Sequence, residues 1–148
     1  MHLVDTSVWI EFLRRQGSVR IQGELKPLIR SGAVAITEWV ILELMSGLRS
    51  SENASNLLDR LTPIHRLSLP VDGWPMAWDL AARLRKKGVS ASAADCLIAT
   101  VASAHDATLI HCDTDFEFIA AHSRLRTMNW VGLLQNPDAG KPRRRGAS

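Results

Sequence analysis

Two acidic residues of this 148-residue chain stand directly after short apolar segments that predict β-strands. Asp5 follows residues 2–4, and Asp113 follows residues 108–112. In an open parallel sheet, ligands bind just beyond the carboxyl ends of the strands, which is where both carboxylates would lie. Aspartate also caps the helices that follow such strands, so a capping role for either residue stays open.

Two further acids, Glu43 and Asp95, lie inside predicted helices and have no basic partner. Their neighbours three and four positions away are small or apolar: Trp39, Val40, Ser46 and Gly47 around Glu43, and Ala91, Ser92, Ile98 and Ala99 around Asp95. A solvated helical acid usually has a Lys or Arg at that spacing, and an unpaired charge is costly to bury. A bound cation would account for both acids; the alternative is an exposed carboxylate on an otherwise buried helix.

Together Asp5, Glu43, Asp95 and Asp113 form a set of oxygen ligands with no Cys or His at zinc spacing. Such ligands suit Mg²⁺ or Mn²⁺. One or two of these ions can polarise a phosphoryl oxygen and lower the pKa of an attacking water, which is the chemistry of phosphodiester hydrolysis. Bound ions would also overturn the negative field of four acids and attract a phosphate.

Three polar residues beside these acids are secondary candidates. Asp115 lies two positions after Asp113 and could cap the helix that begins near Phe116. Thr6 and Ser7 could contact metal, water or phosphate, although capping of the helix that follows is the role favoured for this pair.

One histidine and two cysteines adjoin the acids without favouring the metal. His111 alternates with Asp113 along a predicted strand, and a core position is favoured over a ligand role. Cys96 and Cys112 are expected as small buried residues because thiolates do not favour Mg²⁺. Two cysteines are also too few for a disulfide scaffold.

The elements that must position these residues alternate between short apolar strands and helices. Strands are predicted at 2–4, 33–36, 64–67, 108–112 and 125–128, and helices at 8–13, 19–29, 38–48, 53–61, 70–87, 93–104 and 115–121. Trp78, Leu80, Ala81 and Leu84 are expected to contact the core. Without hairpin signals or repeats, this order predicts a single α/β domain, a three-layer α/β/α sandwich around a parallel sheet.

Charge divides the chain into a neutral domain and a basic tail. Lys141 and Arg143–Arg145 outweigh Asp138 by the whole net charge of +3, so the rest of the chain is neutral. We therefore expect a domain over 1–134 and a disordered Pro/Gly/Arg tail over 135–148, which either touches nucleic acid or has no role. No apolar run approaches the roughly 18–20 residues of a membrane span, and no signal-peptide pattern opens the chain, so a cytoplasmic protein is expected.

The acidic motifs resemble those of the PIN-domain ribonucleases, and among them the VapC-type toxins of toxin–antitoxin pairs. The matching pieces are residues 4–7, Glu43, residues 94–99 and residues 111–116, and the likeness spans about 3–133. The resemblance implies a PIN-like fold and a metal-dependent endoribonuclease that cuts a structured RNA such as tRNA or a ribosomal RNA loop. It places Asp5, Glu43, Asp95 and Asp113 in the active site, with Asp5 and Asp95 as the most direct ligands and Asp115 as a ligand in some relatives.

The same resemblance implies a homodimer and a VapB-like antitoxin whose tail fills the active-site groove. Aromatic residues that could serve such surfaces, or else belong to the core, are Trp9, Trp39, Trp74 and Trp78. Basic residues that could contact RNA, or else form solvated faces, are Arg14, Arg15, Arg83, Arg85, Lys86 and Lys87.

Three other functions are alternatives to this one. A catalytically silent PIN-fold module that binds RNA or a partner would lack one of the acids, and none is missing. A phosphoaspartyl receiver domain needs a Lys near its last strands, whereas no Lys lies between Asp95 and Lys141. A DNA-directed 5′-nuclease would need insertions for which 148 residues leave no room.

Overall fold

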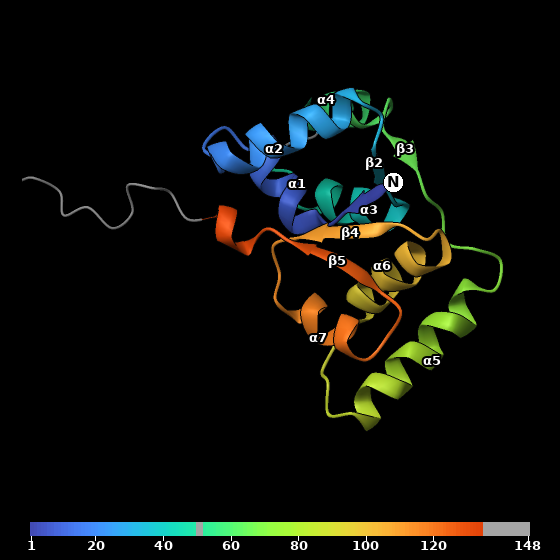
Figure 1. Cartoon of the computed structure of the whole chain (residues 1–148). Coiled ribbons are helices and arrows are strands. Elements are labelled where there is room, and N and C mark those ends of the chain that lie inside the picture. The colour runs from blue at the N-terminus through green and yellow to red at the C-terminus, as the bar shows by residue number, and fades with distance from the viewer. Residues whose placement is uncertain (50–51, 135–148) are drawn as a thin grey trace, which may run out of the picture.

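The computed structural model describes residues 1–49 and 52–134, which form a five-stranded sheet with helices on both faces (Figure 1). The strands are β1 (His2–Val4), β2 (Val34–Ile36), β3 (His65–Arg66), β4 (Thr108–His111) and β5 (Arg126–Asn129). All pairings are parallel, in the order β3-β2-β1-β4-β5. The tail expected to be disordered, 135–148, lies outside the described residues.

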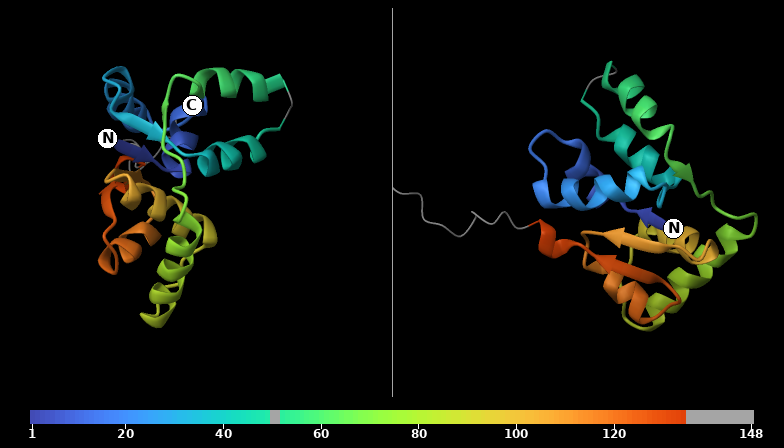
Figure 2. Two further views of the ribbon diagram at one scale, coloured as in Figure 1. Left: turned by 90° about the vertical axis from the view of Figure 1, so that its right-hand side faces the viewer. Right: turned by 45° about the horizontal axis from the view of Figure 1, so that its top comes forward.

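Helices cover this sheet in two layers. They are α1 (Thr6–Leu13), α2 (Val19–Arg30), α3 (Glu38–Ser46), α4 (Glu52–Leu61), α5 (Gly73–Lys86), α6 (Ala93–Ala104) and α7 (Asp115–Ala121), with a 3₁₀ turn at Val131–Leu133. Helices α1–α4 lie on one side of the sheet and α5–α7 on the other, with α5 extending beyond the body of the molecule (Figure 2). The predicted three-layer sandwich with a parallel sheet is therefore confirmed.

The strand order places the ends of β1 and β4 side by side. From β1 the chain builds outward through β2 and β3, then returns to add β4 and β5 on the other side of β1. The direction of winding thus changes between β1 and β4, which pair from His2 with Thr108 to Val4 with Ile110. This is the topological switch point, where open parallel sheets place their ligands.

The core lies on both faces of the central strands. Along α5, the residues that belong to the core differ in part from those predicted. Leu80 and Leu84 are buried with Gly73 and Ala77, a stripe of helical spacing along α5 that packs on α6. Trp78 is 66% exposed and Ala81 is also exposed, so their expected core positions are wrong. They lie one residue beyond the buried stripe.

The other three tryptophans that were candidates for the core or for an interface, Trp9, Trp39 and Trp74, divide between core and surface. Trp9 is buried against Phe12 with its ring edge-on, as expected for a core residue. Trp39 is half-buried, and Trp74 is 51% exposed. The aromatic content of this chain is therefore not all required for its core.

Local signals set most helix ends, and several observed limits differ from the predicted ones by one to three residues. Helix α5 begins at Gly73 instead of residue 70, because residues 70–73 form a turn in which the Gly73 N–H donates to the Pro70 carbonyl at 2.8 Å. Helix α2 ends at Arg30, one residue beyond its predicted end, and α3 ends at Ser46, two residues before its predicted end. Gly88, at φ 75°, adopts the left-handed conformation after α5 that a helix terminus favours. Among the described helices, none is both long and apolar enough to cross a membrane.

Candidate active site

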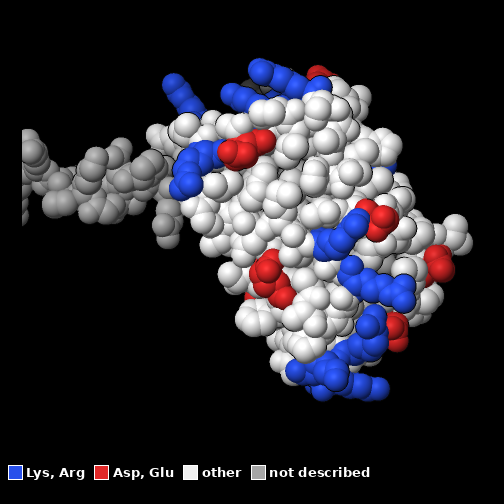
Figure 3. All heavy atoms as spheres, viewed as in Figure 1, with Lys and Arg blue, Asp and Glu red and all other residues white. Residues whose placement is uncertain are grey.

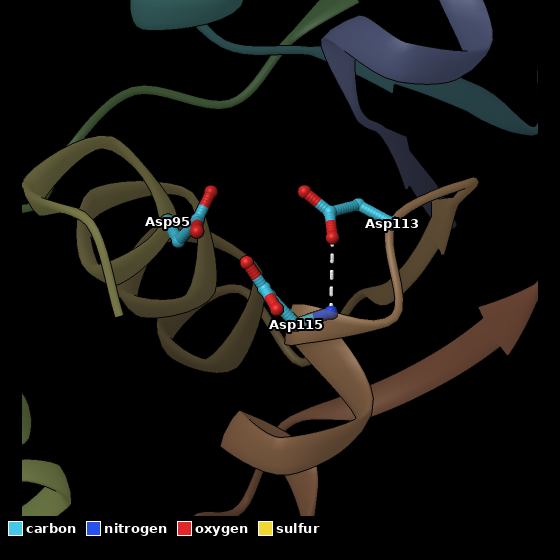
Figure 4. Close-up of side chains that lie close together, drawn as sticks. All are labelled: Asp95, Asp113 and Asp115. Atoms are coloured by element: carbon cyan, nitrogen blue, oxygen red, sulfur yellow. Dashed lines mark hydrogen bonds between the residues drawn. The ribbon is translucent and has the colours of Figure 1, made fainter. Parts of the chain in front are cut away.

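Three carboxylates converge beyond the end of β4. Asp95 lies in the first turn of α6, Asp113 lies in the loop after β4, and Asp115 is the first residue of α7. One oxygen from each carboxylate lies within 4.8 Å of the others, and the three side chains point toward one another (Figure 4). The Asp115 N–H also donates to Asp113 Oδ1 at 2.9 Å, which fixes the turn between them.

Asp5 and Glu43 lie outside this group of three but next to each other. Asp5 is buried at the end of β1 and caps α1, where its Oδ2 accepts from the Ser7 N–H at 3.0 Å and from the Ser7 hydroxyl at 2.5 Å. Glu43 on α3 accepts a hydrogen bond from the Thr6 hydroxyl. Four of the five predicted residues are partly or fully buried, and Asp115 is exposed.

The favoured capping role of Thr6 and Ser7 is wrong. Asp5 occupies the cap position, so both hydroxyl residues fall within the first turn of α1. Their hydroxyls bind the acids, Thr6 to Glu43 and Ser7 to Asp5. Asp115 is not the cap of α7 either, because that position belongs to Thr114.

The pKa values of Asp5 and Asp95 are both raised, in part by the charges of neighbouring carboxylates. Burial raises the pKa of Asp5, opposed by its hydrogen bonds from Ser7 and assisted by the charge of Glu43. Burial also raises the pKa of Asp95; the Ser92 hydroxyl opposes this shift, and the charges of Asp113 and Asp5 add to it. Since Asp95 interacts with both Asp113 and Asp5, it links the two parts of the site.

No basic side chain offsets this charge within residues 1–49 and 52–134. The four ion pairs found there involve Glu11, Asp79, Glu117 and Asp106, and none reaches a predicted site residue. Buried charges are normally paired or bind a metal. Carboxylate oxygens from Asp95, Asp113 and Asp115 are the donors that a hard divalent cation prefers, so the site fits such an ion.

Ser7 makes a connection that sequence reasoning did not reveal. Its hydroxyl donates to Asp5 and also accepts from the Cys112 N–H at 3.0 Å, which joins the ends of β1 and β4. Residues 7 and 112 are far apart along the chain, so no local pattern could have predicted this contact.

His111 and Glu117 form a second connection of this kind. His111 is fully buried, as its expected core position requires, with Nε2 2.8 Å from Glu117 Oε1. Its Nδ1 accepts from the Asp113 N–H at 3.2 Å. The pKa of Glu117 is lowered, first by the hydrogen bond from Thr127; burial is the next largest effect and opposes this shift, and the contact with His111 adds to the lowering.

The cysteines behave as small apolar residues. Cys96 is buried and Cys112 half-buried. Burial, with smaller effects of the Glu11 and Asp5 charges, raises the pKa of Cys112 to about 12. A protonated thiol is a poor ligand, in agreement with the all-oxygen site.

A family model and a curated relative match most of this chain. The family model described as PIN domain matches residues 2–121. Ribonuclease VapC11 of Mycobacterium tuberculosis is 32% identical over 135 residues, which is 88% of this chain and 99% of the relative.

Two solved structures share the fold. The crystal structure of VapBC2 from Rickettsia felis, bound to a DNA fragment from its promoter, matches with a TM-score of 0.73 and 22% identity, covering 87% of this chain and 98% of that one. FitAcB from Neisseria gonorrhoeae matches with a TM-score of 0.71 and 25% identity over 87% of this chain and 97% of that one.

Proposed function

Because this chain belongs to the PIN-domain family and, within it, to the VapC ribonucleases, we propose that it is a Mg²⁺- or Mn²⁺-dependent endoribonuclease that cuts a structured RNA of the tRNA or rRNA class. It would act in the cytoplasm as the toxin of a toxin–antitoxin pair. The observation that supports this function most directly is the convergence of three unpaired carboxylates at the switch point of the sheet.

The residues divide the work according to their positions. Asp95, Asp113 and Asp115 would hold the ion, and Asp5 and Glu43 would complete the site from α1 and α3 by ligating it or orienting water. When bound, the ion polarises the phosphoryl oxygen and acidifies the attacking water. Ser7 fixes the orientation of the Asp5 carboxylate through its N–H and its hydroxyl.

A cleavage assay on total cellular RNA tests this function. The wild-type chain is incubated with Mg²⁺ or Mn²⁺, or with EDTA, beside Asp113→Asn and the control Asp59→Asn, which changes an exposed acid on α4. We expect discrete fragments that require both the metal and Asp113, and unchanged cleavage by the control. Intact RNA with folded wild-type protein free of any partner would instead indicate a silent binding module. Cleavage that persists in Asp113→Asn would refute the site.

Basic side chains gather at the free end of α5, where they could guide the RNA (Figure 3). They are Arg83, Arg85 and Lys86 in the last turn of that helix. Contacts to phosphate make binding weaken with salt, so replacing Arg85 and Lys86 by Ala should lower RNA affinity and reduce its salt dependence. An unchanged salt dependence would assign these residues to a solvated face.

A VapB-like antitoxin is the proposed partner, and an apolar groove of about 660 Å³ between α1, α3 and α4 suits one of its segments. Leu13, Leu44 and Leu57 line the groove together with Ile10, which is 45% exposed. Ile10→Glu should prevent co-purification with a co-expressed antitoxin. Leu58→Glu is the matched control, since Leu58 is 42% exposed but does not line the groove. Equal binding by both variants would exclude this groove.

We also propose a homodimer, supported by the exposed aromatic surface of α5. Trp74 and Trp78 lie four residues apart on α5, 51% and 66% exposed. Large exposed aromatic side chains are favoured at interfaces. Light scattering should find a dimer that Trp78→Ser dissociates and that Phe118→Ser, at a position on α7 that is 58% exposed, leaves intact. A monomeric wild type would contradict the proposal.

A further inference from the structure

Two consecutive N–H groups of the loop that carries Asp113 are held by side chains from opposite sides. The Cys112 N–H donates to the Ser7 hydroxyl at 3.0 Å, and the Asp113 N–H donates to His111 Nδ1 at 3.2 Å. The Asp115 N–H then donates to Asp113 Oδ1 at 2.9 Å. The conformation of this loop therefore depends on two residues that are not among the carboxylates.

The hydrogen bonds of His111 define its state. Because Nδ1 accepts from a backbone N–H, it carries no proton, so the proton of the neutral ring is on Nε2. Nε2 then donates to Glu117 Oε1 at 2.8 Å. The same oxygen accepts from the Thr127 hydroxyl at 2.8 Å, which ties α7 to β5. Phe116 packs beside the imidazole, with ring centroids 5.3 Å apart.

We propose that His111, oriented by Glu117, is a positioning residue that sets the spacing of Asp113 and Asp115 for the divalent cation. The proposal rests on the proposed metal site. Glu117 fixes the tautomer and the ring, the ring fixes the Asp113 amide, and that amide places the carboxylate that faces Asp95 and Asp115. Groups that orient metal ligands in this indirect way typically affect metal affinity by about 10–100-fold.

Two substitutions at His111 distinguish the role of the Nδ1 acceptor from that of the rest of the imidazole ring. His111→Asn keeps an oxygen at the place of Nδ1, where it can accept from the amide two residues on, as asparagine does in turns. His111→Leu fills similar space without any acceptor. Glu117→Ala removes the orienting group and provides a second route if the buried leucine prevents folding, since the Glu117 side chain is 44% exposed.

The primary measurement is direct binding of Mn²⁺ to the metal-free full chain, by calorimetry or by the spin resonance of free Mn²⁺. The half-saturating Mn²⁺ concentration for RNA cleavage is measured beside it. We expect His111→Leu to weaken binding at least about 10-fold, Glu117→Ala to weaken it several-fold, and His111→Asn to stay within about 3-fold of wild type. Ser18→Ala is the control, because it also removes buried hydrogen bonds, at the start of α2, without touching the loop.

The outcomes distinguish this proposal from the function on which it rests. Wild-type Mn²⁺ affinity in folded His111→Leu or Glu117→Ala would overturn the positioning role and leave the metal site intact. Equal weakening by His111→Asn and His111→Leu would also overturn it, because the acceptor would then not matter. A wild-type chain that binds no Mn²⁺ would overturn the metal site and this proposal together.

Discussion

Replacing Asp95 by Asn should make the metal-free protein more stable at neutral pH. The Asp95 carboxylate is half-buried, has no basic partner among the described residues, and faces Asp113 and Asp115. In the absence of a cation, folding brings these like charges together and removes solvent from them. Asparagine has nearly the same shape, keeps the backbone N–H that Ser92 caps at 3.1 Å, and removes the charge.

The size of the effect follows from the distance. Two unit charges at the limiting separation of 4.8 Å repel by about 1 kcal/mol in a water-like dielectric and by about 3.5 kcal/mol at an effective dielectric constant near 20. Asp95 also occupies the third position of α6, where a negative charge favours the helix by roughly 0.3–1 kcal/mol. The net gain should be about 1–2 kcal/mol, which raises Tm by roughly 2–8 °C in a domain of this size.

The change of folding stability with pH shows in which direction the Asp95 charge acts. The folded pKa of Asp95 is raised above the ordinary value of 3.8, so the folded state binds more protons between these two values and loses stability as pH rises through that range. Below pH 3.8, where the carboxyl is neutral in both the folded and the unfolded state, Asp95→Asn should be no more stable than wild type. Its gain in the free energy of unfolding should be complete above the raised pKa.

Thermal unfolding in EDTA across this pH range is the assay. Asp59→Asn serves as the control on α4 and should change the free energy of unfolding by less than about 0.5 kcal/mol. Lower stability of Asp95→Asn than of wild type at pH 7.5 would refute the reasoning, as would an advantage that is equally large at pH 3.5.

Three further predictions concern the rest of the site. Ser7→Ala should destabilise the protein by about 1–3 kcal/mol and slow cleavage, because Asp5 loses a charged hydrogen bond and the Cys112 amide loses its acceptor. Chemical denaturation tests the loss of stability, and the acid limb of the cleavage pH profile should move to higher pH. Mn²⁺ at 100 times its Kd should raise the free energy of unfolding of wild type by about 2.7 kcal/mol and leave Asp113→Asn almost unchanged, as thermal shift would show. Cys112, with a pKa of about 12, should react with iodoacetamide at pH 8 far more slowly in the folded chain than in urea, and equal rates would contradict its burial.

The sequence allowed the architecture to be predicted because each signal was local. Alternating short strands and helices indicated the parallel sandwich, and unpaired acids inside the helices pointed to Glu43 and Asp95. What could not be predicted depends on which face of an element meets a neighbour. The periodicity of α5 does not distinguish its buried stripe from Trp78 beside it, since both contain apolar residues at helical spacing.

The errors at the site have the same origin. Capping by Thr6 or Ser7 is a reasonable local prediction, yet β1 ends at Val4 as predicted and the next residue, Asp5, takes the cap. Both hydroxyls are then available for contacts with α3 and with the end of β4. Such contacts join residues 37 and 105 positions apart, and only the folded chain shows them.

These long-range contacts explain how a repulsive site can keep its shape before a cation arrives. The carboxylates gain nothing from each other, so their positions must be held by groups whose bonds do not require the ion. Ser7 holds Asp5 and the Cys112 amide, and His111 holds the Asp113 amide, so helix α1 and strand β4 support the acids through neutral donors and acceptors. A site preorganised in this way loses less conformational entropy when the ion binds. The affinity for the ion should therefore depend on Ser7 and His111 as well as on the carboxylates they position.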